Sequence, residues 1–158
     1  MLAAAHLMLP LYAPEVPARA LAAVRFVEEV RQADGLIIAS PGYHGGPSGM
    51  VKNALDYLED LRDEDPPYLD GRAVGCIATA SGWQATVSTL VGLRSIVHAL
   101  RGWPTPMGAA VNTAGVVFDE RGECVDPGTR FQLELVGRQV VEFCRLRSAN
   151  AVASGRGP

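Results

Sequence analysis

Lysine, cysteine and long apolar runs are all scarce in this sequence. Lys52 is the only lysine, and a formal net charge of −3 provides no basic surface for nucleic acid or an anionic membrane. No apolar stretch reaches the length that spans a bilayer. The first eleven residues also lack the basic segment that opens a signal peptide. We therefore expect a cytoplasmic protein with neither nucleic acid nor a membrane as its partner.

The three cysteines, Cys76, Cys124 and Cys144, follow no metal-ligand or redox spacing. Cys76 and Cys144 lie in apolar runs, which predicts small core residues. Unpaired thiols of this kind are typical of a reducing cytosol. The histidines also lack the spacing of metal ligands. The acidic residues of segment 59–65 are more typical of a solvated helix end than of a metal site.

The length of 158 residues suits a single domain, and 48% hydrophobic against 20% charged residues excludes a disordered chain. Short apolar runs alternate with longer amphipathic segments, which is the pattern of an α/β fold. We expect one domain over residues 1–147. The small and polar end, 148–158, is expected to be a disordered tail.

Amphipathic spacing predicts four helices. The first covers about 18–32, and its apolar positions recur every three residues: Leu21, Val24, Val27 and Val30. The second covers about 48–61, opens at Pro47 or Ser48, and has an apolar stripe of Met50, Val51, Ala54, Leu55 and Leu58. The other two contain the apolar positions of 90–100 and 133–143.

Three apolar runs predict strands, at 36–39, 73–80 and 106–111. The first, Leu36–Ala39, is continuous, as expected of a strand that helices cover on both faces. In open parallel sheets, ligands bind beyond the carboxyl ends of the strands. The segments that directly follow the first two strands are therefore where a site is expected.

Segment 40–56 (SPGYHGGPSGMVKNALD) follows the first strand and runs into a helix. Gly42, Gly45 and Gly46 have no side chains, so the backbone can approach a flat ligand closely. Its N–H groups can then reach the carbonyls and ring nitrogen of a flavin. Tyr43 and His44 can flank or cover such a ring.

This segment resembles the motif S-P-x-Y-H/N-x-x-x-S/P-G-x-L-K-N-A-L-D of the NADPH-dependent FMN reductases. The matching residues are Ser40, Pro41, Tyr43, His44, Gly49, Lys52, Asn53, Ala54, Leu55 and Asp56. The resemblance implies a flavodoxin-like doubly wound parallel sheet of three layers, with the flavin ring against 41–45. Lys52, Asn53 and Asp56 are expected to cap, pair or touch another subunit rather than to act in catalysis.

The second informative segment, Ser81-Gly82-Trp83, follows the second strand. The family usually has a Ser-Gly-Gly-like turn here that also borders the flavin, so Trp83 departs from the pattern. It either covers the ring or narrows the nicotinamide site, or it is a partly buried packing residue. The sequence alone leaves both interpretations open.

The residues predicted to bind the cofactor are Ser40, Pro41, Gly42, Tyr43, His44, Gly45, Ser81, Gly82 and Trp83. The resemblance implies reduction of FMN by NADPH or NADH, or FMN-mediated reduction of a quinone-type small-molecule acceptor, in a homodimer or homotetramer. No catalytic side chain is predicted, because the cofactor carries the chemistry. One alternative is an electron-carrier flavodoxin, although that class is typically strongly acidic. The other is a degenerate interaction protein that binds no flavin.

The family's opening strand and its Gly-Ser-x-Arg-like phosphate loop have no counterpart before Pro10. The segment His6–Tyr12 instead resembles the end of the family's second strand and its following loop. In the strand order 2-1-3-4-5 the first strand lies inside the sheet, so the expected sheet is truncated at its N-terminal side. A late recorded start, a fragment and a true variant are the three explanations that remain open.

Overall fold

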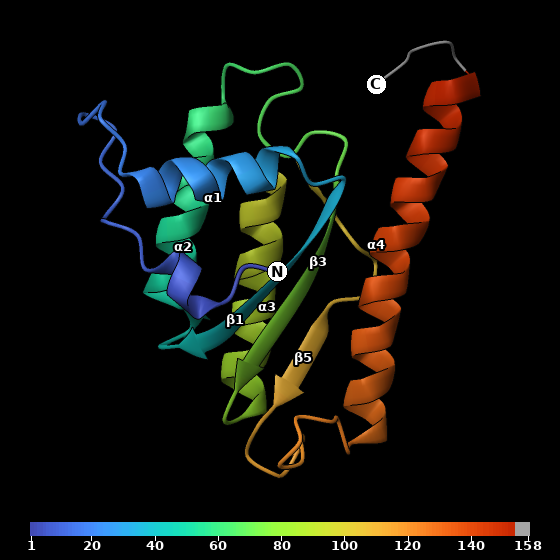
Figure 1. Cartoon of the computed structure of the whole chain (residues 1–158). Helices are drawn as coiled ribbons and strands as arrows, with labels where there is room; N and C mark the ends of the chain where they lie inside the picture. Colours follow the sequence, from blue (N-terminus) through green and yellow to red (C-terminus); the bar gives the residue numbers. More distant parts are fainter. Residues whose placement is uncertain (154–158) are drawn as a thin grey trace.

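The chain folds into three layers in the computed structural model, which describes residues 1–153 and the side chains of residues 1–150. A mostly parallel sheet lies between α1, α2 and α3 on one face and α4 on the other (Figure 1). The strands are β1 (Gly35–Tyr43), β2 (Gly46–Pro47), β3 (Ala73–Ala80), β4 (Trp103–Pro104) and β5 (Ala109–Asn112). The helices are α1 (Leu21–Arg31), α2 (Gly49–Asp56), α3 (Trp83–Ala99) and α4 (Pro127–Ala153), with the short 3-10 helices η1 (Ala4–Leu7) and η2 (Tyr57–Leu61).

β3 is the central strand of the sheet. It pairs in parallel with β1 on one side and with β4 and β5 on the other. In the described residues, the opposite edge of β1 pairs only with β2, at Gly42 and Tyr43. These layers and parallel pairs confirm the doubly wound α/β class.

The strand expected over 106–111 was wrong in its start and its continuity. β5 begins only at Ala109, and a separate short strand, β4 (Trp103–Pro104), precedes the predicted range; the two pair with different parts of β3. Pro104 and Pro106 have no N–H to donate, so a continuous ladder is interrupted between them. Thr105 still donates its N–H to the Val74 carbonyl at 3.0 Å, which keeps this edge against β3.

The continuous apolar run of β1 predicts burial on both faces, but one of the two faces is partly exposed. Leu36 and Ile38 pack into the core beneath the helices, but Ile37 on the other face is 51% exposed. In the described residues, α4 is the helix on that face, and it packs most extensively over β3 and equally over β1 and β5. It meets β1 near Gly35, where an added Cβ would lie 2.8 Å from Cys144 Sγ. The rest of this face of β1 stays open.

The predicted apolar face of α1 was also partly wrong. The buried residues are Ala23, Phe26, Val27 and Val30, whereas Leu21 is 63% exposed and Val24 is exposed too. A helix turns about 100° per residue, so a strict three-residue repeat drifts around the axis. Leu21 and Val30 consequently lie on opposite sides. On α2, Met50 is likewise exposed, while Val51, Ala54 and Leu55 are buried. The last predicted position, Leu58, is buried too but lies in η2, because α2 ends at Asp56.

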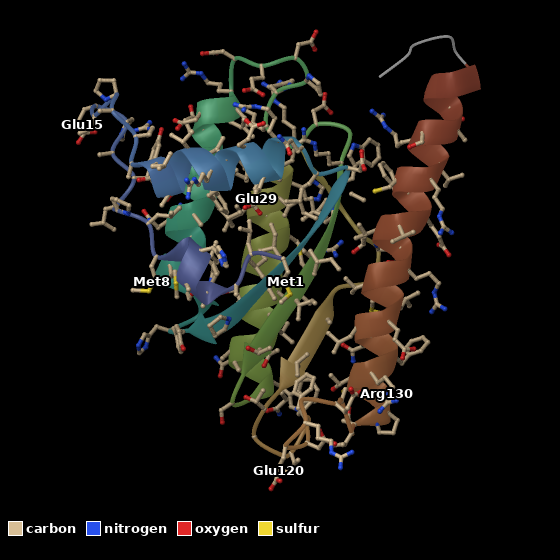
Figure 2. All side chains as sticks on the ribbon, in the orientation of Figure 1. Met1, Met8, Glu15, Glu29, Glu120 and Arg130 are labelled. Carbon is tan, nitrogen blue, oxygen red and sulfur yellow. The ribbon has the colours of Figure 1, made fainter. Side chains whose placement is uncertain are left out.

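The N-terminal segment does not form the strand end that its resemblance predicted. Residues Ala4–Leu7 form η1, and Met8 projects away from the fold (Figure 2). A side chain of α2 provides the backbone hydrogen bonds that a sheet would otherwise provide. Asn53 Nδ2 donates to the Pro10 carbonyl at 2.9 Å, and Asn53 Oδ1 accepts from Tyr12 N at 2.8 Å. Asn53 therefore acts as a tether for this segment.

Replacing Asn53 by Ala should destabilise the protein by roughly 1–3 kcal/mol, because the partly buried Tyr12 N–H loses its acceptor and the Pro10 carbonyl is left with the Tyr57 hydroxyl. Amide hydrogen exchange should speed up in residues 1–12 before it does so in β3. The matched control is Lys52→Ala, which removes only an exposed i,i+4 ion pair with Asp56 at 2.6 Å. Equal protection of residues 1–12 in both variants would contradict the tether.

The acidic residues of 59–65 pair with arginines. Asp60 contacts Arg19 at 2.8 Å and Glu64 contacts Arg31 at 2.7 Å. Within the described residues, no group of three or more His, Cys, Asp or Glu side chains is arranged to hold a metal ion. These ion pairs join the end of η2 to α1 and to the segment before it.

The expected disordered tail is in part helical. α4 continues to Ala153, so the first residues of segment 148–158 belong to it, and residues 154–158 lie outside the described part. The helix continues because the sequence contains neither Gly nor Pro between Gly137 and Ala153. No helix among the described residues is long and apolar enough to cross a bilayer.

Cys76 lies fully buried on β3, which confirms the predicted core position, and burial raises the pKa of its thiol to about 11. A thiol reagent should therefore label the half-buried Cys124 and Cys144 in the folded protein and reach Cys76 only after unfolding. Mass spectrometry of the labelled peptides measures this order. Early labelling of Cys76 in native buffer would show that β3 is not the closed centre of the sheet.

Candidate functional site

The loops after β1 and β3 lie side by side at the carboxyl ends of these strands, as their parallel pairing requires. In Figure 1 the carboxyl ends of β1 and β3 point to the lower part of the view. A cavity of about 360 Å³ lies between the two loops. Its lining comprises Gly45 from the first loop together with Ser81, Gly82, Trp83, Gln84, Ala85 and Ser88. The structure thus joins the two segments that the sequence singled out separately.

The first loop is a tight hairpin that connects β1 to β2. Tyr43 pairs with Gly46, which leaves His44 and Gly45 as the two turn residues, and both have positive φ (51° and 89°). Positive φ at both central residues is the signature of a type I′ turn. The turn leaves Tyr43 and His44 exposed at the edge of the sheet.

Ser40 holds this loop from inside. It is 1% exposed, and its hydroxyl accepts a hydrogen bond from Ser48 N at 2.9 Å and donates to the Pro41 carbonyl at 2.8 Å. Ser48 in turn caps α2 by accepting from Val51 N at 3.2 Å. The Ser40 side chain therefore fixes the shape of the loop and does not face the cavity.

The three glycines of the loop differ in what surrounds them. A Cβ at Gly42 would collide with the Thr89 hydroxyl and lie 3.2 Å from the Ala85 carbonyl, so Gly42 is needed for packing against α3. The lack of a side chain at Gly42 therefore serves the packing against α3, and its contact with a ligand stays a prediction. At Gly45 and Gly46 a Cβ would meet nothing within 4 Å. These two positions leave the open approach that a flat ligand needs.

The second loop turns at Gly82, whose φ is 124° and where an added Cβ would also face open space. Gly82 N donates to Asn112 Oδ1 at 2.9 Å. Asn112 is the last residue of β5 and was not predicted as part of the site. Its sequence signal is a polar residue directly after an apolar strand, at the edge where ligands bind.

Trp83 begins α3 directly after this turn and lines the cavity. It is 61% exposed, which counts against the interpretation as a packing residue. His98 lies exposed farther along the same helix and is not in the cavity lining.

The cavity lining carries no ionisable side chain. The loop that follows β5 contains several charged residues, but Glu120 at its tip points away from the sheet (Figure 2). Arg130 donates its Nε to the Cys124 carbonyl at 3.1 Å. The site thus suits a neutral, flat group rather than a strongly charged one.

A larger hollow of about 610 Å³ lies at the opposite end of the sheet. It is lined by residues of 32–35 and by Val140, Val141, Cys144, Arg145 and Ser148 of α4. This end carries the amino end of β1, whereas open α/β sheets bind ligands beyond the carboxyl ends. The smaller cavity is therefore the candidate site.

The sequence model of a known family matches residues 3–115, and the description of that family is NADPH-dependent FMN reductase. The chain belongs to this family. An FMN-dependent NADPH-azoreductase of Staphylococcus aureus (strain USA300) is 34% identical over 118 residues, which is 73% of this chain. The chain spans only 59% of the length of that relative.

Two solved structures share the fold. The flavoenzyme NAD(P)H:(acceptor) oxidoreductase FerB of Paracoccus denitrificans superposes with a TM-score of 0.73 at 19% identity, over 89% of this chain and 77% of that one. An oxidoreductase of Corynebacterium diphtheriae gives a TM-score of 0.59 at 19% identity, over 85% of this chain and 66% of that one. The fold is therefore flavodoxin-like, as the sequence predicts.

Proposed function

We propose that this protein reduces FMN at the expense of NADPH, or passes electrons through FMN to a quinone-type small-molecule acceptor. The observation that carries the proposal is the cavity that joins the hairpin of β1 and β2 to the turn at Gly82. Family membership supports it, since both loops belong to the segment that the family model matches. When bound, FMN supplies the hydride-accepting and hydride-donating ring.

The residues of this chain would bind and orient that ring. The open backbone at Gly45, Gly46 and Gly82 leaves room for close approach, and Tyr43, His44 and Trp83 stand exposed beside it. Ser40, Pro41, Gly42 and Ser81 complete the nine predicted contact positions, and Ser40 and Gly42 also shape the loop.

The test is a pair of titrations followed by a turnover assay. The purified chain is titrated with FMN and with riboflavin, and NADPH and NADH oxidation is then measured with free FMN. Because the cavity lining is uncharged, riboflavin should bind within about threefold of FMN. FMN binding without NADPH oxidation would favour an electron carrier, and no flavin bands after incubation would favour a flavin-free interaction protein.

We also propose that the protein works as a homodimer or homotetramer in the cytoplasm. The exposed apolar side chains of α1 and β1, such as Leu21, Val24 and Ile37, support an assembly. The three free cysteines support a reducing compartment. Light scattering coupled to size exclusion tests the assembly, and a monomer at all concentrations would contradict it.

A further inference from the structure

Gly82 is held on both sides by side chains outside its own loop. Its N–H donates to Asn112 Oδ1 at 2.9 Å. Its carbonyl accepts from Thr86 Oγ1 at 2.7 Å and from Thr86 N at 3.2 Å, and Thr86 is fully buried. These bonds fix the peptide groups around a residue whose φ of 124° is rare for any residue except glycine.

The next residue in the chain is Trp83, the first of α3. Side chains on a helix lean toward its N-terminus and cover the preceding turn. The indole therefore leans toward the cavity that it lines, and its 61% exposure leaves a ring face available to a ligand. The orientation of that face depends on the backbone at Gly82, and so on Asn112.

We propose that Asn112 is a positioning residue that acts through Gly82 on Trp83, and that Trp83 gives the cavity its preference for a neutral planar ring. This inference rests on the proposed function. The cavity lining offers no ionic contact, and Trp83 is the aromatic side chain in it, so the indole is the surface there on which a planar ring can stack. Trp83 is also where this sequence departs from the usual glycine of the family.

The chemistry of Asn112 provides a sharp test. Asn112 Oδ1 accepts from both Gly82 N at 2.9 Å and Ala114 N at 3.0 Å. Both bonds use the side-chain oxygen as acceptor. An aspartate at 112 can therefore accept both hydrogen bonds, and an alanine can accept neither. Asn112→Asp is therefore the conservative variant, and Asn112→Ala the disruptive one.

The experiment measures riboflavin affinity by calorimetry for the wild type, Asn112→Ala, Asn112→Asp, Trp83→Ala and the Asn112→Ala/Trp83→Ala double variant. Asn112→Ala and Trp83→Ala should each weaken binding by about 3- to 10-fold, the range of one aromatic stack. Asn112→Asp should stay within about twofold of wild type. The double variant should be no weaker than Trp83→Ala alone, because Asn112 acts through Trp83.

Additive losses in the double variant, or a loss in Asn112→Asp equal to that in Asn112→Ala, would overturn the inference. Full affinity in the single variants would overturn it while leaving the proposed function intact. A wild-type chain that binds no flavin overturns both, and this is seen before any substitution is made. Thermal unfolding checks each fold, and Asn112→Gln, which displaces the oxygen by one methylene, replaces Asn112→Ala if the latter does not fold.

Discussion

Gly45→Val should weaken FMN binding at least tenfold, about 1.4 kcal/mol. Gly45 is the residue of the first loop that lines the cavity, and an added Cβ there meets only open space. A valine would therefore place its methyl groups where the flat ligand is proposed to lie. Isothermal titration with FMN measures the change.

The positive φ of Gly45 adds strain to any such variant, so the comparison needs a matched control. Gly122→Val provides one, since Gly122 also has a positive φ (79°) and an open Cβ direction, but it lies outside the cavity lining. Gly122→Val should be destabilised to a similar degree and should keep its FMN affinity. Equal affinity in the two valine variants would remove Gly45 from the site.

Gly42→Val should have the largest effect on stability, a loss of at least roughly 1–3 kcal/mol from overpacking. The Cβ would collide with the Thr89 hydroxyl and lie 3.2 Å from the Ala85 carbonyl. Thr89 is fully buried and Ala85 O is helix backbone, so neither can move away easily. Urea unfolding measures the loss, and flavin binding should fall with it because the hairpin is pushed off α3.

Gly46→Val is the control for this prediction. Gly46 belongs to the same hairpin, has no positive φ, and leaves a Cβ free of neighbours within 4 Å. Its free energy of unfolding should change little, because valine suits a strand. If Gly42→Val were as stable as Gly46→Val, the proposed packing of the hairpin against α3 would be wrong.

Local sequence patterns predicted correctly those elements whose burial does not depend on which neighbouring element covers them. β3 was predicted at both ends because a strand covered on both faces reads as a continuous apolar run. β1 carries a similar run, yet Ile37 is exposed, because burial depends on which helix lies above it. The predicted buried face of α1 was partly wrong for a related reason. A three-residue repeat fits more than one side of a helix, and the contact with η2 selects the side that is buried.

The site could be predicted as two loops but not as a set of contacts. The motif from Ser40 to Asp56 located the first loop, and its position after a strand located the second. The packing role of Gly42 depends on Thr89, and the bond to Gly82 comes from Asn112, each many residues away. Such long-range pairs leave no local signal in one sequence.

We propose that the loops after β1 and β3 together hold a flavin ring. The most direct measurement is the fluorescence of Trp83 during an FMN titration of the Trp103→Phe variant, in which Trp83 is the only indole. Trp103 lies in β4, packs beside Phe143 of α4 and does not line the cavity. We expect saturable quenching of Trp83 at the same FMN concentrations that shift the flavin absorption bands. FMN that binds without quenching Trp83, or that does not bind at all, would contradict it.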